Sequence, residues 1–404
     1  MAEYITGMRT VTGYKKFDYN ALANLPPKTH GSSHELGGSD QITADMIGAV
    51  TVEDGYLQPM IVVNSDAESV VCTCGDTVIE AREDDGVLIY DVPDFGEYVV
   101  TASSNATDKN GDATVVSKTY NVSMNEIRRH QIDVLSLNVG TLEETAWETI
   151  SYISELGLGQ NYWSVGDTKS VYLKGSVGSA CELDDTLYVY IIGFDHNSEY
   201  EGTGIHFGGF KKPDSTGAFK DVALCDEKYY VYSDGTNNPD GEIWFFIDWI
   251  SLYYAPSWES CVMRQYILGA NSAINPTPNT LMAALPNTLR NVIKPMYKNT
   301  GGDPALWQTK DYLSLLSEYE ILGRRDMAVE VESKYNKQYD YYASGNSTFK
   351  YHHNIEDKKV KYWLRSDYYD ANCSLWINVQ DNQENATSAM GSLYSLGVAP
   401  IFKV

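Results

Sequence analysis

The chain has 404 residues, of which 43% are apolar and 12% aromatic, so it has enough apolar material for about two or three folded domains. Its 55 Asp and Glu residues outnumber 30 Lys and Arg residues, and the resulting net charge of -25 excludes DNA and RNA as primary partners. No apolar stretch reaches the roughly 20 residues that span a bilayer, and the N-terminus lacks the basic and then apolar layout of a signal peptide. We therefore expect a folded protein with no membrane insertion and no signal peptide.

Residues 1–52 are expected to form an extended attachment and oligomerisation segment. The stretch LPPKTHGSSHELGGSDQIT is rich in Gly, Ser, Pro and His and has too few apolar residues to close a core alone. It resembles the N-terminal region of bacteriophage tail-fibre and tail-tip proteins, which leads into a trimeric stalk. The resemblance implies a homotrimer that contacts other virion proteins through this segment; the alternative is a disordered leader. The matching residues are His34, Gly37, Gly38, Ser39, Asp40 and Ile42.

Residues 53–138 are predicted to form a small β-sandwich. Short segments rich in Val, Ile, Thr and Tyr alternate there with Gly, Asp, Asn and Pro, as is typical of strands and turns. They are LQPMIVVN, SVVCTCGDTVIEARE, GVLIYDVP, GEYVVTASS and ATVVSKTYNVS. VPDFGEYVVTAS followed by SKTYNVS resembles the immunoglobulin-like modules that act as spacers in phage tail and bacterial surface proteins. The resemblance implies a mechanical role.

A helix is predicted over TLEETAWETISYISELG, residues 141–157. Thr141 and Glu144 fit a capping box, and Gly157 fits a helix end. Apolar residues recur every three to four positions, which predicts a face that packs against the following domain. These residues are Leu142, Ala146, Ile150, Ile153 and Leu156.

The motifs that follow predict an α+β domain, which we place at residues 139–404. They include strand-like TLYVYIIGFDHN and GIHFGGFKK, helix-like TLMAALPNTLRNVIKPMYKNTGG, and then DYLSLLSEYEILG, YDYYASGNSTFKYH, YWLRS and GVAPIF. In this order they resemble an uncharacterised domain family of phage and prophage tail proteins. That family resembles in turn the C-type lectin fold of formylglycine-generating enzymes and of the variable proteins of diversity-generating retroelements. The expected fold class is therefore mainly β with a C-type-lectin-like α+β C-terminal domain.

The last segment, residues 363–404, is the expected variable region. In the variable proteins, an opening like W-L-R-S and a close like G-V-R-P-A-F hold a run of substituted surface positions. Asp367 stands here where Pro is usual and Ala399 where Arg is usual; these departures bear on diversification by a retroelement and not on the fold. The expected framework residues are Trp363, Leu364, Arg365, Gly397, Pro400 and Phe402, and Ser366 and Val398 also match.

Between these ends lies a run of Tyr, Asp, Asn, Ser and Gln, which the resemblance makes the binding face. Tyr and Trp give large contact area with few rotatable bonds, and Asn, Ser and Asp supply adaptable hydrogen bonds. This mixture suits a host cell-surface receptor that is either a glycan or a protein; the alternative is an ordinary polar loop. The candidate ligand-binding residues are Asp367, Tyr368, Tyr369, Asp370, Asn372, Ser374, Trp376, Asn378, Gln380 and Asn382.

Neither a catalytic site nor a cofactor is predicted. The cysteines lack a C-x-x-C pair and are expected to be free, and only Cys373 follows Cys261, so the paired-cysteine chemistry of the formylglycine-generating enzymes is not supported. Acidic pairs such as Glu318 with Glu320 are expected by chance in so acidic a chain. The segment LLSEYEILG is instead interpreted as a structural turn.

Two kinds of site could hold a metal ion, and the sequence specifies neither of them. In a trimer, His30 and His34 near Asp40 could converge on an axial ion, and the acidic loops ELDD and DGTNNPDGE permit calcium. His352 and His353 are expected to point to opposite faces of a strand, which makes them poor joint ligands. Asp195 and His196 are expected to fix a loop.

Together these features predict a phage tail-tip or fibre receptor-binding protein, made in the host cytoplasm and carried on the virion. The alternatives are a structural virion protein, such as a capsid decoration or baseplate cap, and a tail-associated glycan hydrolase. Because the acidic chain would repel the anionic bacterial envelope at long range, attachment would depend on short-range fit and multivalency.

Overall fold

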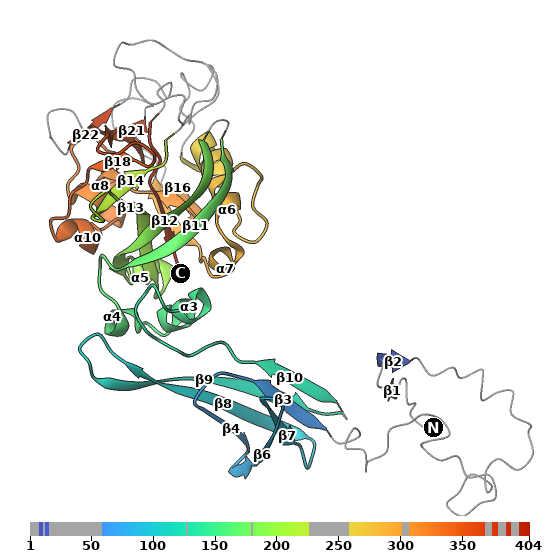
Figure 1. Cartoon of the computed structure of the whole chain (residues 1–404). Helices are drawn as coiled ribbons and strands as arrows, with labels where there is room; N and C mark the ends of the chain where they lie inside the picture. Colours follow the sequence, from blue (N-terminus) through green and yellow to red (C-terminus); the bar gives the residue numbers. More distant parts are fainter. Residues whose placement is uncertain are drawn as a thin grey trace, which may run out of the picture. The chain divides into compact units, whose positions relative to one another are not determined.

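The protein is mainly β, with several sheets and short helices, and the computed structural model divides into two compact units (Figure 1). Unit 1 comprises Met1–Asn105 and Val115–Leu137, and unit 2 comprises Ala106–Thr114 and Asn138–Val404. None of the helices in the described stretches is long and apolar enough to cross a membrane. The described residues are 8–10, 13–15, 59–126, 128–178, 181–225, 258–300, 307–367, 374–378, 385–388 and 396–404.

Unit 1 contains two four-stranded sheets. Their strands are β3 (Met60–Asn64), β4 (Ser69–Cys74), β5 (Thr77–Ile79), β6 (Ala81–Asp84), β7 (Val87–Asp91), β8 (Gly96–Thr107), β9 (Ala113–Met124) and β10 (Arg129–Asp133), beside a separate hairpin of β1 (Met8–Thr10) and β2 (Gly13–Lys15). The strand orders are β10-β3-β7-β6 and β5-β4-β8-β9. Strands β3 and β10, which come first and last along the chain in these two sheets, pair in parallel. Strands β3 to β9 fall in or overlap the segments that the sequence predicted.

The core of unit 1 lies between its two sheets. Ile61 and Tyr90 face it from the first sheet, and Cys72 and Val100 face it from the second. The alternating burial along β8 shows why the sequence pattern was informative, because one face of the strand is covered and the other is not. At the start of β8, the Tyr98 hydroxyl donates to the backbone oxygen of Asp94 at 2.6 Å, which closes the corner between β7 and β8.

Unit 2 is built on a sheet with the order β11-β12-β13-β14-β18-β19. Its C-terminal strand β23 pairs with both β13 and β17 and so brings the end of the chain into the centre of the unit. The strands are β11 (Thr168–Val177), β12 (Cys181–Phe194), β13 (Ile205–Pro213), β14 (Phe219–Ala223), β17 (Ser314–Leu315), β18 (Lys350–His352), β19 (Lys359–Val360) and β23 (Pro400–Lys403).

Two smaller sheets complete unit 2. One is the pair β15 (Met296–Thr300) and β16 (Trp307–Asp311), and the other has the order β20-β21-β22. The latter strands are β20 (Tyr362–Asp367), β21 (Ser374–Asn378) and β22 (Asn385–Ser388). Strand β20 carries the first framework residues of the expected variable region.

The predicted helix at residues 141–157 is shorter than expected. Helix α3 spans Trp147–Glu155, while Thr141 and Glu144 make their reciprocal hydrogen bonds in the turn that precedes it. The capping hydrogen bonds of Thr141 and Glu144 are therefore present, but they stabilise a turn before α3 and not the start of α3 itself. Ile150 is buried as predicted, whereas Leu156 lies beyond the helix and is 48% exposed.

The helix-like stretch at residues 280–302 is only partly helical. The chain forms α6 (Leu281–Ala284), α7 (Asn287–Arg290) and then strand β15. Pro286 explains the break, because a residue that precedes proline favours extended backbone, and Leu285 has ψ 145°. The other helices are α4 (Gly159–Tyr162), α5 (Ser198–Glu201), η4 (Trp258–Ser260), η5 (Met263–Leu268), α8 (Glu318–Leu322), α9 (Glu330–Tyr335) and α10 (Asp340–Ala343).

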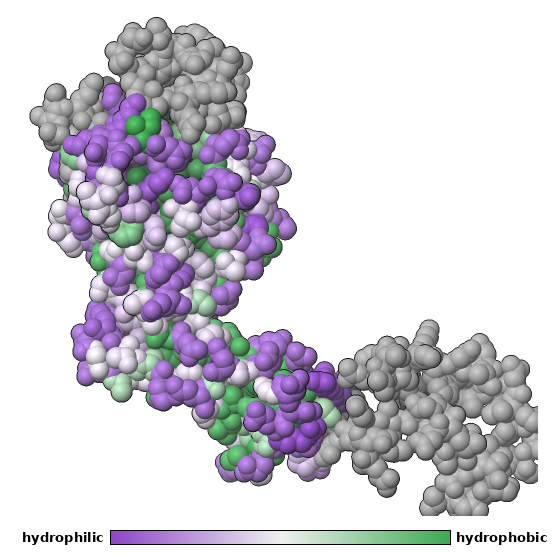
Figure 2. Space-filling view, viewed as in Figure 1, coloured by the Kyte–Doolittle hydropathy of each residue, from purple (hydrophilic) through white to green (hydrophobic). Residues whose placement is uncertain are grey.

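Hydrophilic residues cover most of the visible face of unit 2, whereas unit 1 shows apolar areas among hydrophilic ones (Figure 2). In unit 1, Val71 on β4 and Val78 on β5 are exposed. The cysteines in the described residues form no disulfide, and all except the half-buried Cys74 are buried.

Candidate functional site

The segment between residues 366 and 396 has both of its ends fixed in the same place. The backbone N–H of Trp363 donates to the oxygen of Gly397 at 2.9 Å, and the N–H of Gly397 donates to the oxygen of Lys361 at 2.8 Å. Val398 and Leu224 then exchange two further backbone hydrogen bonds of 2.9 Å. The two ends of the segment are thus held next to each other by backbone hydrogen bonds.

Strand β20 fixes the first end by packing on two sides. Trp363 is fully buried in one apolar cluster of unit 2, and its neighbour Leu364 is fully buried in the other. At the second end, Phe402 stacks on Phe207 of β13, with ring centroids 5.1 Å apart. Burial of aromatic rings of this size stabilises the frame strongly and gives it a defined geometry.

Gly397 is required at the second end because of the space around it. A Cβ atom at this position would lie 2.8 Å from the Cβ of Ala223 and 3.2 Å from the backbone oxygen of Lys361. Distances of this kind force one of the two neighbouring segments to move. The glycine of the GVAPIF motif therefore permits the close approach that the backbone hydrogen bonds need.

Arg365 ties β20 to α8 through a buried ion pair. Its guanidinium donates to the carboxylate of Glu320 and, at 2.9 Å, to the backbone oxygen of Leu315. Burial would raise the pKa of Glu320, but the charges of Arg365 and Lys298 outweigh burial and hold this pKa below its usual value. Glu320 also accepts from the backbone N–H of Ser317 at 3.0 Å and thereby completes the capping box of α8.

Lys298 of β15 extends this ion pair into a buried network. Its Nζ lies 3.3 Å from Glu320 Oε1 and 3.6 Å from Glu201 Oε1, and it donates to the Tyr339 hydroxyl at 3.2 Å. Burial lowers the pKa of Lys298, but the two carboxylates outweigh this effect and raise it. The Tyr339 hydroxyl lies 3.1 Å from His206 Nδ1. Buried charges of opposite sign are thus paired, as their desolvation requires.

His196 lies against this network as a neutral ring. It stacks on Tyr339 with centroids 3.7 Å apart, and burial, followed by the charge of Lys298, lowers its pKa to about 3. The adjacent Asp195 has φ 49° and accepts from the backbone N–H of Gly204 at 2.8 Å, so it fixes the loop after β12. The network is enclosed, and its chemical effect is to orient β20.

Ser366 connects the same strand to two further elements. Its hydroxyl donates to Glu332 of α9 at 2.8 Å and accepts from the backbone N–H of Glu318 at 2.7 Å. The Glu318 carboxylate accepts from the backbone N–H groups of Met327 and Ala328, the latter at 2.7 Å. Glu318 and Glu320 therefore have separate structural partners and do not converge as a catalytic pair.

The predicted binding residues fall into two groups. Asp367 ends β20, and Ser374, Trp376 and Asn378 lie on β21, where Trp376 is directly opposite Trp363 in the register. The remaining candidates lie outside the described residues. They are Tyr368, Tyr369, Asp370, Asn372, Gln380 and Asn382.

The structure corrects the expectation for the adjacent histidines. Strand β18 ends at His352, so the alternation of a strand does not extend to His353. Their rings stack with centroids 5.1 Å apart and an interplanar angle of 9°, and both side chains are buried. The expectation of opposite faces held only for extended backbone, and it does not apply to His353, which lies beyond the strand.

The proposed metal positions receive no support from the described residues, where no group of three or more His, Cys, Asp or Glu side chains could hold an ion. In the ELDD segment, Asp184 lies near Lys174 and Asp185 pairs with Lys212. His30, His34 and the loop at residues 234–242 lie outside the described residues.

Sequence reasoning missed most of the buried network. It named Arg365 as framework but not Lys298, Glu201 or Tyr339 as its partners. The Ser-x-x-Glu pattern at Ser317 was the available indication, because it predicts a capping box. Apolar periodicity contains no information about which buried charges will meet.

The comparisons with known proteins concern the C-terminal part of the chain. Residues 247–404 match the family model of a domain of unknown function (DUF6273). The DUF6273 match contains both ends of the framed segment, on β20 and beside β23. It does not contain β13 and β14, although β13 pairs with β23 and β14 pairs with β18, so the folded unit extends beyond the matched residues. No curated protein and no solved structure matches the chain.

Proposed function

We propose that the chain is a phage tail-tip or fibre receptor-binding protein that attaches the virion to the host surface through residues 367–395. The observation that carries this proposal is the frame, which holds the two ends of a Tyr-, Asn- and Ser-rich segment together by backbone hydrogen bonds between Trp363, Gly397 and Lys361. Segments that a rigid scaffold holds at both ends often serve recognition. Aromatic and amide side chains in such a segment suit a receptor surface.

The fold expectations belong to the same proposal. We assign unit 1 an immunoglobulin-like sandwich; its two packed sheets support this, as does the Tyr98 hydroxyl bond to Asp94, since a tyrosine at this corner recurs in that fold. We assign unit 2 a C-type-lectin-like fold on the resemblance of its motifs. Residues 1–52 would attach the chain to the virion as a homotrimer. Strands β1 and β2 are the described part of that segment.

A competition experiment tests the function. Host cells are incubated with the purified full-length chain before virions are added, and adsorption is counted. We expect the chain to block adsorption in a saturable way, because it would occupy the same receptors. Virions that adsorb normally at saturating concentrations of folded chain would exclude the receptor-binding role and favour a structural virion protein. Pretreatment of the cells with protease or with periodate then tells a protein receptor from a glycan.

A further inference from the structure

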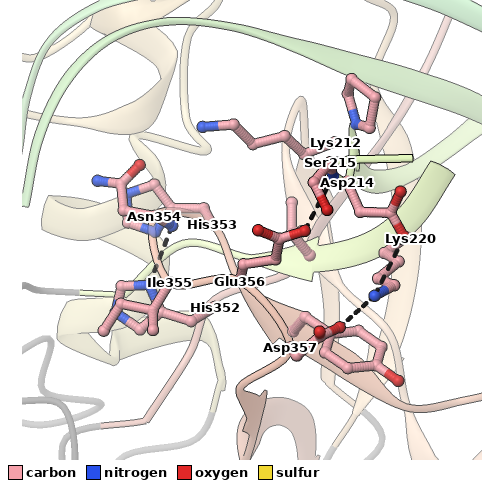
Figure 3. A pocket seen from close by; sticks show the side chains of 13 residues that line it. Lys212, Asp214, Ser215, Lys220, His352, His353, Asn354, Ile355, Glu356 and Asp357 are labelled. Atoms are coloured by element: carbon pink, nitrogen blue, oxygen red, sulfur yellow. Dashed lines mark hydrogen bonds and ion pairs between the residues drawn. The ribbon is translucent and has the colours of Figure 1, made fainter. Parts of the chain in front are cut away.

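A pocket of about 180 Å³ lies on unit 2 between the β13–β14 turn and residues 353–357 (Figure 3). One wall is the turn that begins at Asp214, and the other is the segment that follows β18. The volume equals that of roughly six water molecules at about 30 Å³ each, so the pocket accommodates one ring-sized group.

The two walls are held together by hydrogen bonds and ion pairs. The Asp214 carboxylate closes its own turn by accepting from the backbone N–H of Thr216 at 2.8 Å, and it lies 3.2 Å from Lys220 Nζ. Lys220 also pairs with Asp357 across the pocket, and Glu356 accepts from the backbone N–H of Ser215 at 2.8 Å. The pocket is therefore organised before a ligand arrives, which lowers the entropic cost of binding.

The charges around the pocket do not favour an anion. Lys220 is compensated by Asp214 and Asp357, and Lys212 is compensated by Asp185. Glu356 adds a further carboxylate, so the surroundings repel phosphate and other anions. Asp357 uses one carboxylate oxygen in its contact with Lys220, whereas Glu356, which lies in the middle of the pocket in Figure 3, is held by both the backbone and the side chain of Ser215. The second oxygen of Asp357 can accept a hydrogen bond from a ligand hydroxyl group.

Apolar surface completes the pocket. Val222 and Ile355 form part of the lining, and Ile355 is 44% exposed. The centroid of the Tyr351 ring lies 5.2 Å from Lys220 Nζ. Carboxylate acceptors beside apolar side chains match a ring that has hydroxyl groups on its edge and C–H groups on its faces. We propose that this pocket binds one neutral sugar ring. The proposal is independent of the receptor face at residues 367–395 and concerns a separate site.

The test uses saturation-transfer NMR to measure binding of glucose, galactose and N-acetylglucosamine to the full-length chain. Glucuronate and glucosamine serve as anionic and cationic probes. At least one neutral sugar should bind saturably, with a dissociation constant on the order of 1 mM, as expected for so small a ligand. Neither charged probe should bind more tightly. If no neutral sugar gives a saturable effect, or if a charged probe binds more tightly, the proposal is wrong.

Substitutions in the pocket test whether the sugar binds there. Asp357→Ala should weaken it by at least about tenfold, the equivalent of one lost hydrogen bond to a charged group. Asp357 has a side chain that is 73% exposed, so the variant should fold. Asp91→Ala is the matched control, since Asp91 forms an exposed ion pair with Arg82 in unit 1. Glu356→Gln gives a second measurement. Unchanged sugar binding in both Asp357→Ala and Glu356→Gln would overturn the assignment to this pocket.

Discussion

Glu320 is the residue on which the frame of unit 2 depends most. It is fully buried and contacts cations from two other elements, Arg365 of β20 and Lys298 of β15. The same carboxylate accepts from the backbone N–H of Ser317 and so completes the cap of its own helix, α8. One side chain thus joins three elements, and its loss would leave two buried cations without their shared partner.

Glu320→Gln should therefore lower the free energy of unfolding by about 3 to 5 kcal/mol. Urea denaturation followed by tryptophan fluorescence measures this change. The control is Asp326→Asn, since Asp326 forms an exposed ion pair with Arg324 in the same unit and should contribute about 1 kcal/mol or less. Equal unfolding midpoints for the two variants would contradict the role given to the network.

Trp363→Ala should also destabilise the protein by about 3 to 5 kcal/mol, because removal of a buried aromatic side chain leaves a cavity. Trp363 is fully buried, whereas Tyr266 is 56% exposed and its replacement by Ala should have little effect. Thermal denaturation of both variants compares them. A melting temperature for Trp363→Ala like that of the parent would mean that Trp363 is not an anchor of the frame.

His196 should make stability sensitive to acid. Burial, with the charge of Lys298, lowers its pKa to about 3, against about 6.5 when unfolded. Below pH 6.5 the unfolded chain therefore binds more protons at His196 than the folded chain does. The stability that comes with a neutral His196 is complete above pH 6.5 and is lost as the pH falls towards 3. The loss is about 1.4 kcal/mol per pH unit for one such group.

Comparison of the parent with His196→Gln between pH 7 and pH 4.5 isolates this effect. The comparison is needed because burial raises the pKa of Glu201 and Glu318, whose protonation at low pH acts in the opposite direction. The parent should lose more stability than the variant over this range in urea titrations. Parallel pH dependences would show that His196 contributes nothing.

At the scale of elements, prediction succeeded where packing produces a pattern. The strands of unit 1 were predictable because one face of each sheet is covered, which alternates apolar and polar residues. The helix-like stretch at residues 280–302 forms two short helices because Pro286 interrupts it, and a strand follows them. The register that places Val398 beside Leu224 joins segments far apart in the chain, so no local pattern reveals it.

Gly397→Ala tests the close approach at the second end of the frame. The added Cβ would meet Ala223 and the Lys361 backbone, so we expect a loss of about 1 to 3 kcal/mol in the free energy of unfolding. Gly96→Ala is the control, because a Cβ there meets only Cys74 Sγ, at 3.8 Å. If Gly397→Ala is as stable as Gly96→Ala, the segment can be held without this contact.

At the scale of the whole molecule, the proposed arrangement is a homotrimer joined through residues 1–52. The composition of that segment gives it too little apolar surface to fold alone. Light scattering should find a trimer for the full chain and a monomer for a chain that begins at Tyr56. Monomers in both cases would contradict the oligomerisation role of the segment.

The central claim is that residues 367–395 bind the host receptor. Its most direct test is adsorption of virions that carry Tyr368→Ala and Tyr369→Ala together. Trp376 is left unchanged because it is on strand β21, opposite Trp363 of β20 in the register. Loss of a central aromatic contact typically costs about 2 kcal/mol or more of binding. The account predicts strongly reduced adsorption with an unchanged melting temperature, beside normal adsorption for Tyr266→Ala. Normal adsorption by the folded double variant would contradict it.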